Sequence, residues 1–311
     1  MMIHPDLPKI YAFSYDSNWI EVDIFVKTYD ESDANTQAMS DDGTGTIELT
    51  GSNAEQDVVA QSAISIDRVI ALVGQNGGVL RTTVDATGAF GGTAAYPSFE
   101  MDSSLFNAQA AVFSPDGAVL YISTRAGREI AATNSDRSGT PTWTSLLPDD
   151  SLCDIAISPD GVSIYALGCT SSVVFHVRLN GTNGVVASTT TYQADDSIVG
   201  STSGGVRAVE ASDTVVLVGR KSSNEVVLFQ RDIATGVLSS AEAIQLDGGT
   251  FTGLSISGTV AALTLSGTKL FVSVAGENGG LLVLNVSCAT PSPTEGTEAV
   301  RMEALDVPET L

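Results

Sequence analysis

The chain has 311 residues, of which 43% are hydrophobic and only 16% are charged. This balance is typical of a folded domain rather than a disordered segment. Its 37 acidic and 14 basic residues give a net charge of −23. A surface of this sign repels phosphate backbones, so nucleic acid is excluded as a partner, whereas cations and basic protein surfaces are favoured. No apolar run approaches the length that crosses a bilayer, so we predict no membrane span.

One pattern recurs from end to end: an alternating apolar run, a polar turn, and a second alternating run. Its clearest copy is AQAAVFSPDGAVLYIS, around Ser114-Pro-Asp-Gly117. Alternation with period two predicts strands, and the turn joins them into an antiparallel hairpin. The first polar position of each hairpin turn is predicted, in chain order, at Ser14, Ser65, Ser114, Ser158, Glu210 and Thr264.

A second landmark follows each hairpin: an Asp or Asn followed closely by Gly in five units, and the weaker match Pro-Thr-Glu-Gly in the last. Both residue types tolerate the positive φ of tight turns, so each landmark predicts the turn between two outer strands. In chain order the landmarks are Asp42–Gly45, Asp85–Gly88, Asp136–Gly139, Asn180–Gly184, Asp232–Gly236 and Pro293–Gly296. The first inner strand is predicted at residues 9–13 and the last outer strand at 297–307.

These units predict an all-β fold: a β-propeller of four-stranded antiparallel blades, in a single domain over residues 1–311. Six blades are counted, and a seventh, degenerate blade is the alternative. The predicted blades cover approximately residues 8–54, 55–100, 101–147, 148–198, 199–248 and 249–307.

The stretch VVLVGRKSSNEVVLFQRDIATGVLSSAEAI, residues 215–244, resembles a blade of the lactonase-like, YVTN-type propellers. Residues 110–130 and 155–179 are similar to the first half of that pattern, with Ser-Pro-Asp-Gly at Ser114–Gly117 and Ser158–Gly161. The resemblance implies a lactonase-type activity on a small cyclic ester. It also implies that Arg125 or Arg220, which follow the second strand of their units, holds the substrate; the alternative is that these arginines pack between blades.

A propeller sorts its connections onto two faces, and the connections between consecutive blades surround the mouth of the central channel. Aspartates are predicted in these connections, with Asp6, Asp57 and Asp150 each eight positions before a hairpin turn. Carboxylates that meet at a rim bind hard cations, so Ca²⁺ near Asp57, Asp150 and Asp196 is one hypothesis. The alternative is that these aspartates only cap loop backbone, and no cofactor is then required.

Three cysteines, Cys153, Cys169 and Cys288, match neither a disulfide framework nor a zinc site, and structural burial is the favoured role. The disulfide state is left open. The two histidines, His4 and His176, are not predicted to be catalytic, and no Ser-His-Asp pattern is found.

The predicted function is a non-catalytic binding or structural module, extracellular or at the cell surface, whose acidic channel face contacts a protein, a glycan or a cation. The alternative is a lactonase-type hydrolase. An exposed outer strand also predicts self-association by edge pairing.

Overall fold

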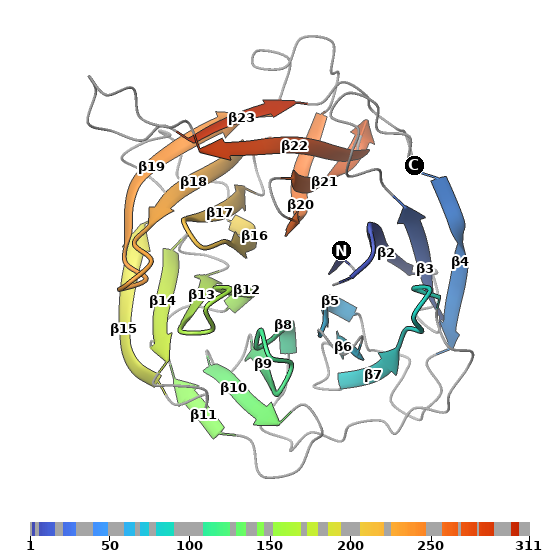
Figure 1. Cartoon of the computed structure of the whole chain (residues 1–311), viewed down its shortest axis with the longest axis horizontal. Coiled ribbons are helices and arrows are strands. Elements are labelled where there is room, and N and C mark those ends of the chain that lie inside the picture. The colour runs from blue at the N-terminus through green and yellow to red at the C-terminus, as the bar shows by residue number, and fades with distance from the viewer. Residues whose placement is uncertain are drawn as a thin grey trace.

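The chain folds into antiparallel sheets arranged in a ring (Figure 1), as described by a computed structural model. The described residues are 2–3, 6–15, 21–28, 40–48, 59–65, 69–74, 79–89, 108–124, 129–134, 142–145, 152–168, 173–179, 186–193, 206–220, 225–246, 257–266, 269–278, 280–288 and 300–304. Within these ranges the strands form six sheets. The prediction of an all-β propeller is therefore confirmed.

The sheets follow one another along the chain, and each is built from consecutive strands. The first contains β1 (Met2–Ile3), β2 (Lys9–Tyr15), β3 (Glu21–Thr28) and β4 (Ser40–Glu48). The second contains β5 (Val59–Ile64), β6 (Val69–Gly74) and β7 (Val79–Thr83). The third contains β8 (Ala108–Phe113), β9 (Val119–Thr124), β10 (Glu129–Asn134) and β11 (Thr142–Ser145).

The remaining sheets repeat the same order. The fourth contains β12 (Leu152–Ile157), β13 (Ser163–Gly168), β14 (Val173–Leu179) and β15 (Val186–Gln193). The fifth contains β16 (Val206–Ala211), β17 (Val215–Arg220), β18 (Glu225–Arg231) and β19 (Leu238–Gln245). The sixth contains β20 (Ser257–Ser266), β21 (Lys269–Asn278), β22 (Gly280–Cys288) and β23 (Val300–Ala304).

The first strand of each sheet, here called its inner strand, lies nearest the centre of the ring (Figure 1). Neighbouring inner strands contact one another in cyclic order: β1 with β5, β5 with β8, β8 with β12, β12 with β16, β16 with β20, and β20 with β1. β1 belongs to the first sheet of the chain and β20 to the last, so the contact between them closes the ring. Residues far apart in the chain are thereby brought to a common centre.

The hydrophobic core lies between the sheets rather than inside any one of them. In β13, Ile164 and Ala166 pack against the third sheet, while Tyr165 and Leu167 pack against the fifth. All four residues are fully buried, so both faces of this strand are covered. A strand buried on both faces carries a continuous apolar run, which explains why these segments are so rich in Val, Ile and Leu.

Three of the predicted landmarks fall on described residues, and two of them are confirmed as turns. In one, the Asp85 carboxylate accepts hydrogen bonds from the N–H and the hydroxyl of Thr87, and Gly88 has a φ of 78°. In the other, Asp232 holds Thr235 in the same way, and Gly236 has a φ of 73°. A positive φ favours glycine, which is why this pattern marks turns so clearly.

The first sheet differs from the prediction. Residues 9–13 belong to its second strand, because β1 pairs with β2 ahead of them. Asp6 lies in the connection between these two strands, so its predicted place between consecutive blades was wrong. The predicted turn at Asp42–Gly45 was also wrong, because these residues lie within β4 and pair with β3.

The hairpin anchors of the last two units were placed two residues early. Glu210 lies in β16 and Thr264 lies in β20, so both belong to inner strands rather than to turns. Ser212 occupies the turn position that Ser114 and Ser158 hold in their own sheets, and Ser266 is the last residue of β20. An isolated polar residue in an apolar strand resembles the start of a turn in the sequence pattern, which explains this difference.

Candidate functional site

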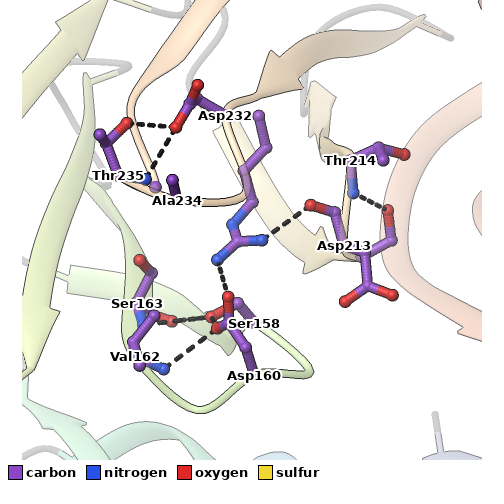
Figure 2. A network of polar contacts seen from close by, with 12 residues as sticks. Ser158, Asp160, Val162, Ser163, Asp213, Thr214, Asp232, Ala234 and Thr235 are labelled. Carbon is purple, nitrogen blue, oxygen red and sulfur yellow. Dashed lines mark hydrogen bonds and ion pairs between the residues drawn. The ribbon is translucent and has the colours of Figure 1, made fainter. Parts of the chain in front are cut away.

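The most extensive polar network described joins the fourth and fifth sheets through Arg231, at the end of β18. This residue is only 4% exposed. Its guanidinium donates to the Asp160 carboxylate at 2.5 Å, to the Tyr165 hydroxyl at 3.0 Å and to the Asp213 carbonyl at 2.7 Å. Figure 2 shows the two acceptors Asp160 and Asp213, which come from different turns, and Thr235 bonded to Asp232 in a third turn. Each of the three guanidinium nitrogens therefore finds an acceptor, which a buried charge requires.

Tyr165 extends this network to the next turn. Its hydroxyl donates to the Gly236 carbonyl at 2.7 Å while it accepts from Arg231. Tyr11 makes the corresponding bond between the first and second sheets, to the Gly88 carbonyl at 2.9 Å. The same tyrosine-to-turn bond at two sheet boundaries identifies it as a structural element of the repeat rather than a reaction centre.

The carboxyl of Asp160 remains ionised within this network. Burial opposes its ionisation, but hydrogen bonds from Ser158 and Arg231 outweigh burial and lower the pKa of Asp160. The ion pair with Arg231 thus holds two neighbouring sheets together at neutral pH.

A serine and a histidine meet in the same region, a pairing that the sequence pattern did not predict. Ser163 Oγ and His176 Nε2 are 3.0 Å apart and share a hydrogen bond, and the His176 ring stacks on Tyr165. Burial, together with the charges of Arg231 and Arg178, lowers the pKa of His176 to about 4. The imidazole is therefore neutral at pH 7.

This Ser–His pair is sealed from solvent. Ser163 is 0% exposed and His176 is 3% exposed. Gly236 covers them so closely that a Cβ added there would lie 2.6 Å from His176 Nε2 and would collide with Ser163 Oγ. A substrate has no route to this serine, so we assign the pair to packing between the sheets.

Unlike the Ser–His pair, two carboxylates lie on the inner strands, at the centre of the ring. Asp154 in β12 is 1% exposed and accepts hydrogen bonds from the backbone N–H groups of Ile155 at 2.8 Å and Val209 at 2.7 Å. The second of these bonds ties β12 to β16. Asp154 therefore has a structural role in joining two inner strands.

Glu210 is the second carboxylate, and it is only partly buried. Its neighbours Val209 and Ala211 face the fourth sheet, so Glu210 faces the sixth. Its carboxyl accepts hydrogen bonds from the backbone N–H groups of Ala211, at 3.1 Å, and Leu265. Burial raises the pKa of Glu210 to about 8, with a further contribution from Asp154. A carboxyl group that keeps its proton at neutral pH can act as an acid.

The predicted site residues are placed as follows. Asp6 is exposed and lies at the end of the first sheet opposite to the expected rim. Arg220 is the last residue of β17, at the predicted end of its sheet. Arg125, Asp57, Asp150 and Asp196 lie outside the described residues. Within the described ranges there is no group of three His, Cys, Asp or Glu side chains that could hold a metal, and Ca²⁺ binding stays a prediction.

Cys153 differs from the expectation of simple burial. It is half-buried and takes part in a disulfide bond. The pairing of β12 with β13 shifts register between Leu152 and Asp154, which leaves Cys153 as the extra residue of a bulge. A regular hairpin register had been assumed, so the extra residue went unpredicted.

No family model matches the chain, and no curated protein matches it in sequence. Solved structures do match. The periplasmic gluconolactonase of Pseudomonas aeruginosa is 16% identical, with a TM-score of 0.63 over 99% of this chain and 88% of that one. A candidate 6-phosphogluconolactonase from Bacteroides fragilis is 13% identical, with a TM-score of 0.61 over 98% and 84%. The fold of this chain is that of a lactonase-like β-propeller.

A structure of a nidogen–laminin complex is also similar, at 10% identity and a TM-score of 0.57 over 89% of both chains. The lactonase-like fold is thus shared with a protein captured in a protein–protein complex. The expected resemblance is confirmed at the level of the fold, and activity has to be argued from residues. The described part of the chain contains no helix long and apolar enough to cross a membrane.

Proposed function

We propose that this chain is a lactonase-type hydrolase that opens a small cyclic ester at the centre of the ring. The observation that carries the proposal is the likeness of nearly the whole chain to two structures described as lactonases. This likeness supports the enzymatic alternative better than the non-catalytic binding module. Arg125 and Arg220 keep their predicted role in orienting the substrate.

Hydrolysis of a lactone needs water to attack the carbonyl carbon, and it needs a proton for the ring oxygen that leaves. Glu210 lies on an inner strand and keeps its proton up to a pH of about 8. It is therefore suited to donate that proton as the carbon–oxygen bond of the ring breaks. The attacking water supplies the new bond to the carbonyl carbon, and one of its protons restores Glu210.

The test is proton release from glucono-1,5-lactone, followed with a pH indicator and corrected for spontaneous hydrolysis. The expected result is a clear acceleration, which falls above pH 8 as Glu210 ionises. Glu210→Gln should lower kcat by about 10²- to 10⁴-fold, the range for loss of a general acid. Asp213→Asn is the matched control, because Asp213 is an exposed carboxylate at the other end of the same sheet. If no small aldonolactone is hydrolysed faster than in buffer, the proposal is wrong.

An extracytoplasmic location is part of the proposal. The disulfide of Cys153 supports it, because such bonds persist in oxidising compartments. The gluconolactonase from Pseudomonas aeruginosa is described as periplasmic, which is compatible with this location.

Protein binding is a second candidate function, and one surface feature favours it. Ile233 and Val237 flank the turn of the fifth sheet and are 57% and 45% exposed. The nidogen–laminin structure is a precedent for a fold of this kind in a protein complex. Replacing both residues with Ser should leave hydrolysis unchanged and abolish any such association.

A further inference from the structure

The inner strand β16 has one backbone edge that does not pair within its own sheet. β16 comes first in the order β16-β17-β18-β19, so it pairs with β17 on one side only. Alternate N–H groups of such an edge strand point away from its partner strand and need another acceptor. Val209 and Ala211 are two positions apart in β16, so their N–H groups point to the same side. Both N–H groups donate to carboxyl groups, and these carboxyl groups come from different sheets.

Asp154 reaches this edge from the fourth sheet. Its Oδ2 accepts the N–H of Val209 at 2.7 Å, and its Oδ1 accepts the N–H of Ile155 at 2.8 Å. Ile155 packs against the third sheet, whereas Asp154, one position earlier, faces the fifth. Asp154 is 1% exposed, so water screens its charge very little. Two N–H donors suit the ionised form of a carboxyl group rather than the neutral form.

Glu210 lies beside Asp154 along the same edge. Its carboxyl accepts the N–H of Ala211 at 3.1 Å and also the N–H of Leu265 in β20. Neighbouring N–H groups on one side of a strand are about 7 Å apart, so carboxyl groups bound to them are close enough to interact. The inner strands β12, β16 and β20 are therefore linked in turn, by Asp154 in the first link and by Glu210 in the second.

The surroundings of Glu210 contain few other ionisable groups. Four strands pack against β16, namely β12, β13, β17 and β20. Among the described side chains of these strands, Asp154 and Tyr165 are the ionisable ones, and Tyr165 is bonded to Gly236 and Arg231. Burial raises the pKa of Glu210, and the charge of Asp154 raises it further.

We infer that Asp154 is a positioning residue for Glu210: it fixes the segment of β16 that carries Glu210 and places a negative charge beside it. A negative charge disfavours a second one nearby, so the carboxyl of Glu210 keeps its proton and stays available as an acid. Asp154 itself is almost fully buried and bonded to backbone, so it acts through Glu210 rather than on the lactone. This inference rests on the proposed role of Glu210 in hydrolysis, but the coupling between the two carboxyl groups can be measured without a substrate.

The first test is the titration of Glu210, followed by NMR of its side-chain carboxyl carbon. In the wild type this carboxyl should titrate with a pKa of about 8. In Asp154→Asn it should titrate at lower pH, because the neighbouring negative charge is removed. Glu210→Gln assigns the signal, since one carboxyl resonance disappears. Asp213→Asn is the matched control, because it removes an exposed carboxylate from the turn after β16 and should leave the titration of Glu210 unchanged.

The second test is the pH profile of glucono-1,5-lactone hydrolysis in the same proteins. The wild-type kcat should fall above about pH 8, as Glu210 ionises. The fall should begin at lower pH in Asp154→Asn, whereas Asp213→Asn should keep the wild-type profile. Loss of a merely structural hydrogen bond would lower kcat by the same factor at every pH and would leave the profile in place.

Circular dichroism and the melting temperature establish that each variant is folded, and Asp154→Ser is a second neutral variant with the same expected result. If the titration of Glu210 moves to lower pH but the wild type hydrolyses no lactone, the coupling stands and the proposed enzyme activity is wrong. If the lactone is hydrolysed with one pH profile in the wild type and in the neutral variants, the enzyme activity stands and the positioning role is wrong. A wild-type Glu210 that titrates near its ordinary pKa of 4.5 also overturns the inference.

Discussion

The buried imidazole of His176 contributes to the folding stability that the protein loses in acid. Replacing His176 with Gln should remove most of this contribution. His176 is 3% exposed, and burial lowers its pKa from 6.5 to about 4. In the unfolded chain the ring takes up a proton near pH 6.5, whereas in the folded protein it does not do so until about pH 4. Between these values the unfolded state binds more protons, so folding stability falls as the pH falls.

The magnitude follows from the pKa difference between the two states. It corresponds to about 3 kcal/mol of stability lost between pH 7 and pH 4, with little further loss from this group below pH 4. His176→Gln should cost about 1–2 kcal/mol at pH 7, because the stacking on Tyr165 and the bond to Ser163 are altered. The variant should nevertheless lose about 3 kcal/mol less than the wild type on acidification.

Urea unfolding at a series of pH values between 4 and 7.5 measures this difference directly. The many carboxylates titrate in both proteins, so the comparison isolates the imidazole. His4→Gln is the matched control, because His4 is the other histidine of the chain. Stability curves of wild type and His176→Gln that run parallel from pH 7 to pH 4 would show that the ring is protonated in the folded state, and the reasoning would fail.

Two further predictions concern the sheet boundaries and the disulfide. Gly236→Ala should destabilise the protein by about 1–3 kcal/mol more than Gly161→Ala. Both glycines have a φ near 72°, but a Cβ at Gly236 would lie 2.6 Å from His176 Nε2, whereas one at Gly161 would lie 3.3 Å from Pro115. Equal melting temperatures for the two variants would contradict this. The disulfide partner of Cys153 should be Cys169, which follows β13 in the same hairpin, rather than Cys288, which ends β22 in another sheet. Peptide mapping without reduction identifies the linked pair, and a Cys153–Cys288 peptide would refute the assignment.

The propeller was predictable because its turns are fixed by local hydrogen bonds. In the Ser158 turn, the serine hydroxyl bonds to Asp160 at 2.5 Å and accepts from the N–H of Ser163 at 3.1 Å, all within six residues. The residue types that allow such bonds are visible in the sequence wherever the turn recurs. The strands between these turns then follow from alternation.

The turn of the first sheet is hard to recognise because Leu7 stands where the two clearest copies have Gly117 and Gly161. Without the glycine, the turn around Asp6 lost its most visible mark. The repeat is still visible in the spacing between the turn aspartate and the tyrosine of the next strand. Asp6 and Tyr11 are five positions apart, and so are Asp160 and Tyr165. The tyrosine is retained because it binds the turn of the next sheet, a contact that a reading of local turns does not include.

Contacts between sheets were the part that the sequence pattern did not predict. Arg231 and Asp160 are 71 positions apart, and nothing in either segment identifies the other as its partner. The stacking of each sheet on the next decides which side chains come into contact. An extra residue in a bulge changes the direction of these side chains but leaves the strand as apolar as before.

Glu210 shows what a polar residue inside an apolar strand can mean. The sequence pattern predicts a turn at Glu210, because a charged side chain interrupts the apolar run between Val209 and Ala211. In the structure the strand continues past it, and the cost of burying the carboxylate is met by raising the pKa of Glu210 to about 8 rather than by an ion pair. An acid held in this way on an inner strand is poorly explained by stability alone, since an apolar side chain would pack there at lower cost. That imbalance is the physical reason for testing Glu210 first as a functional residue.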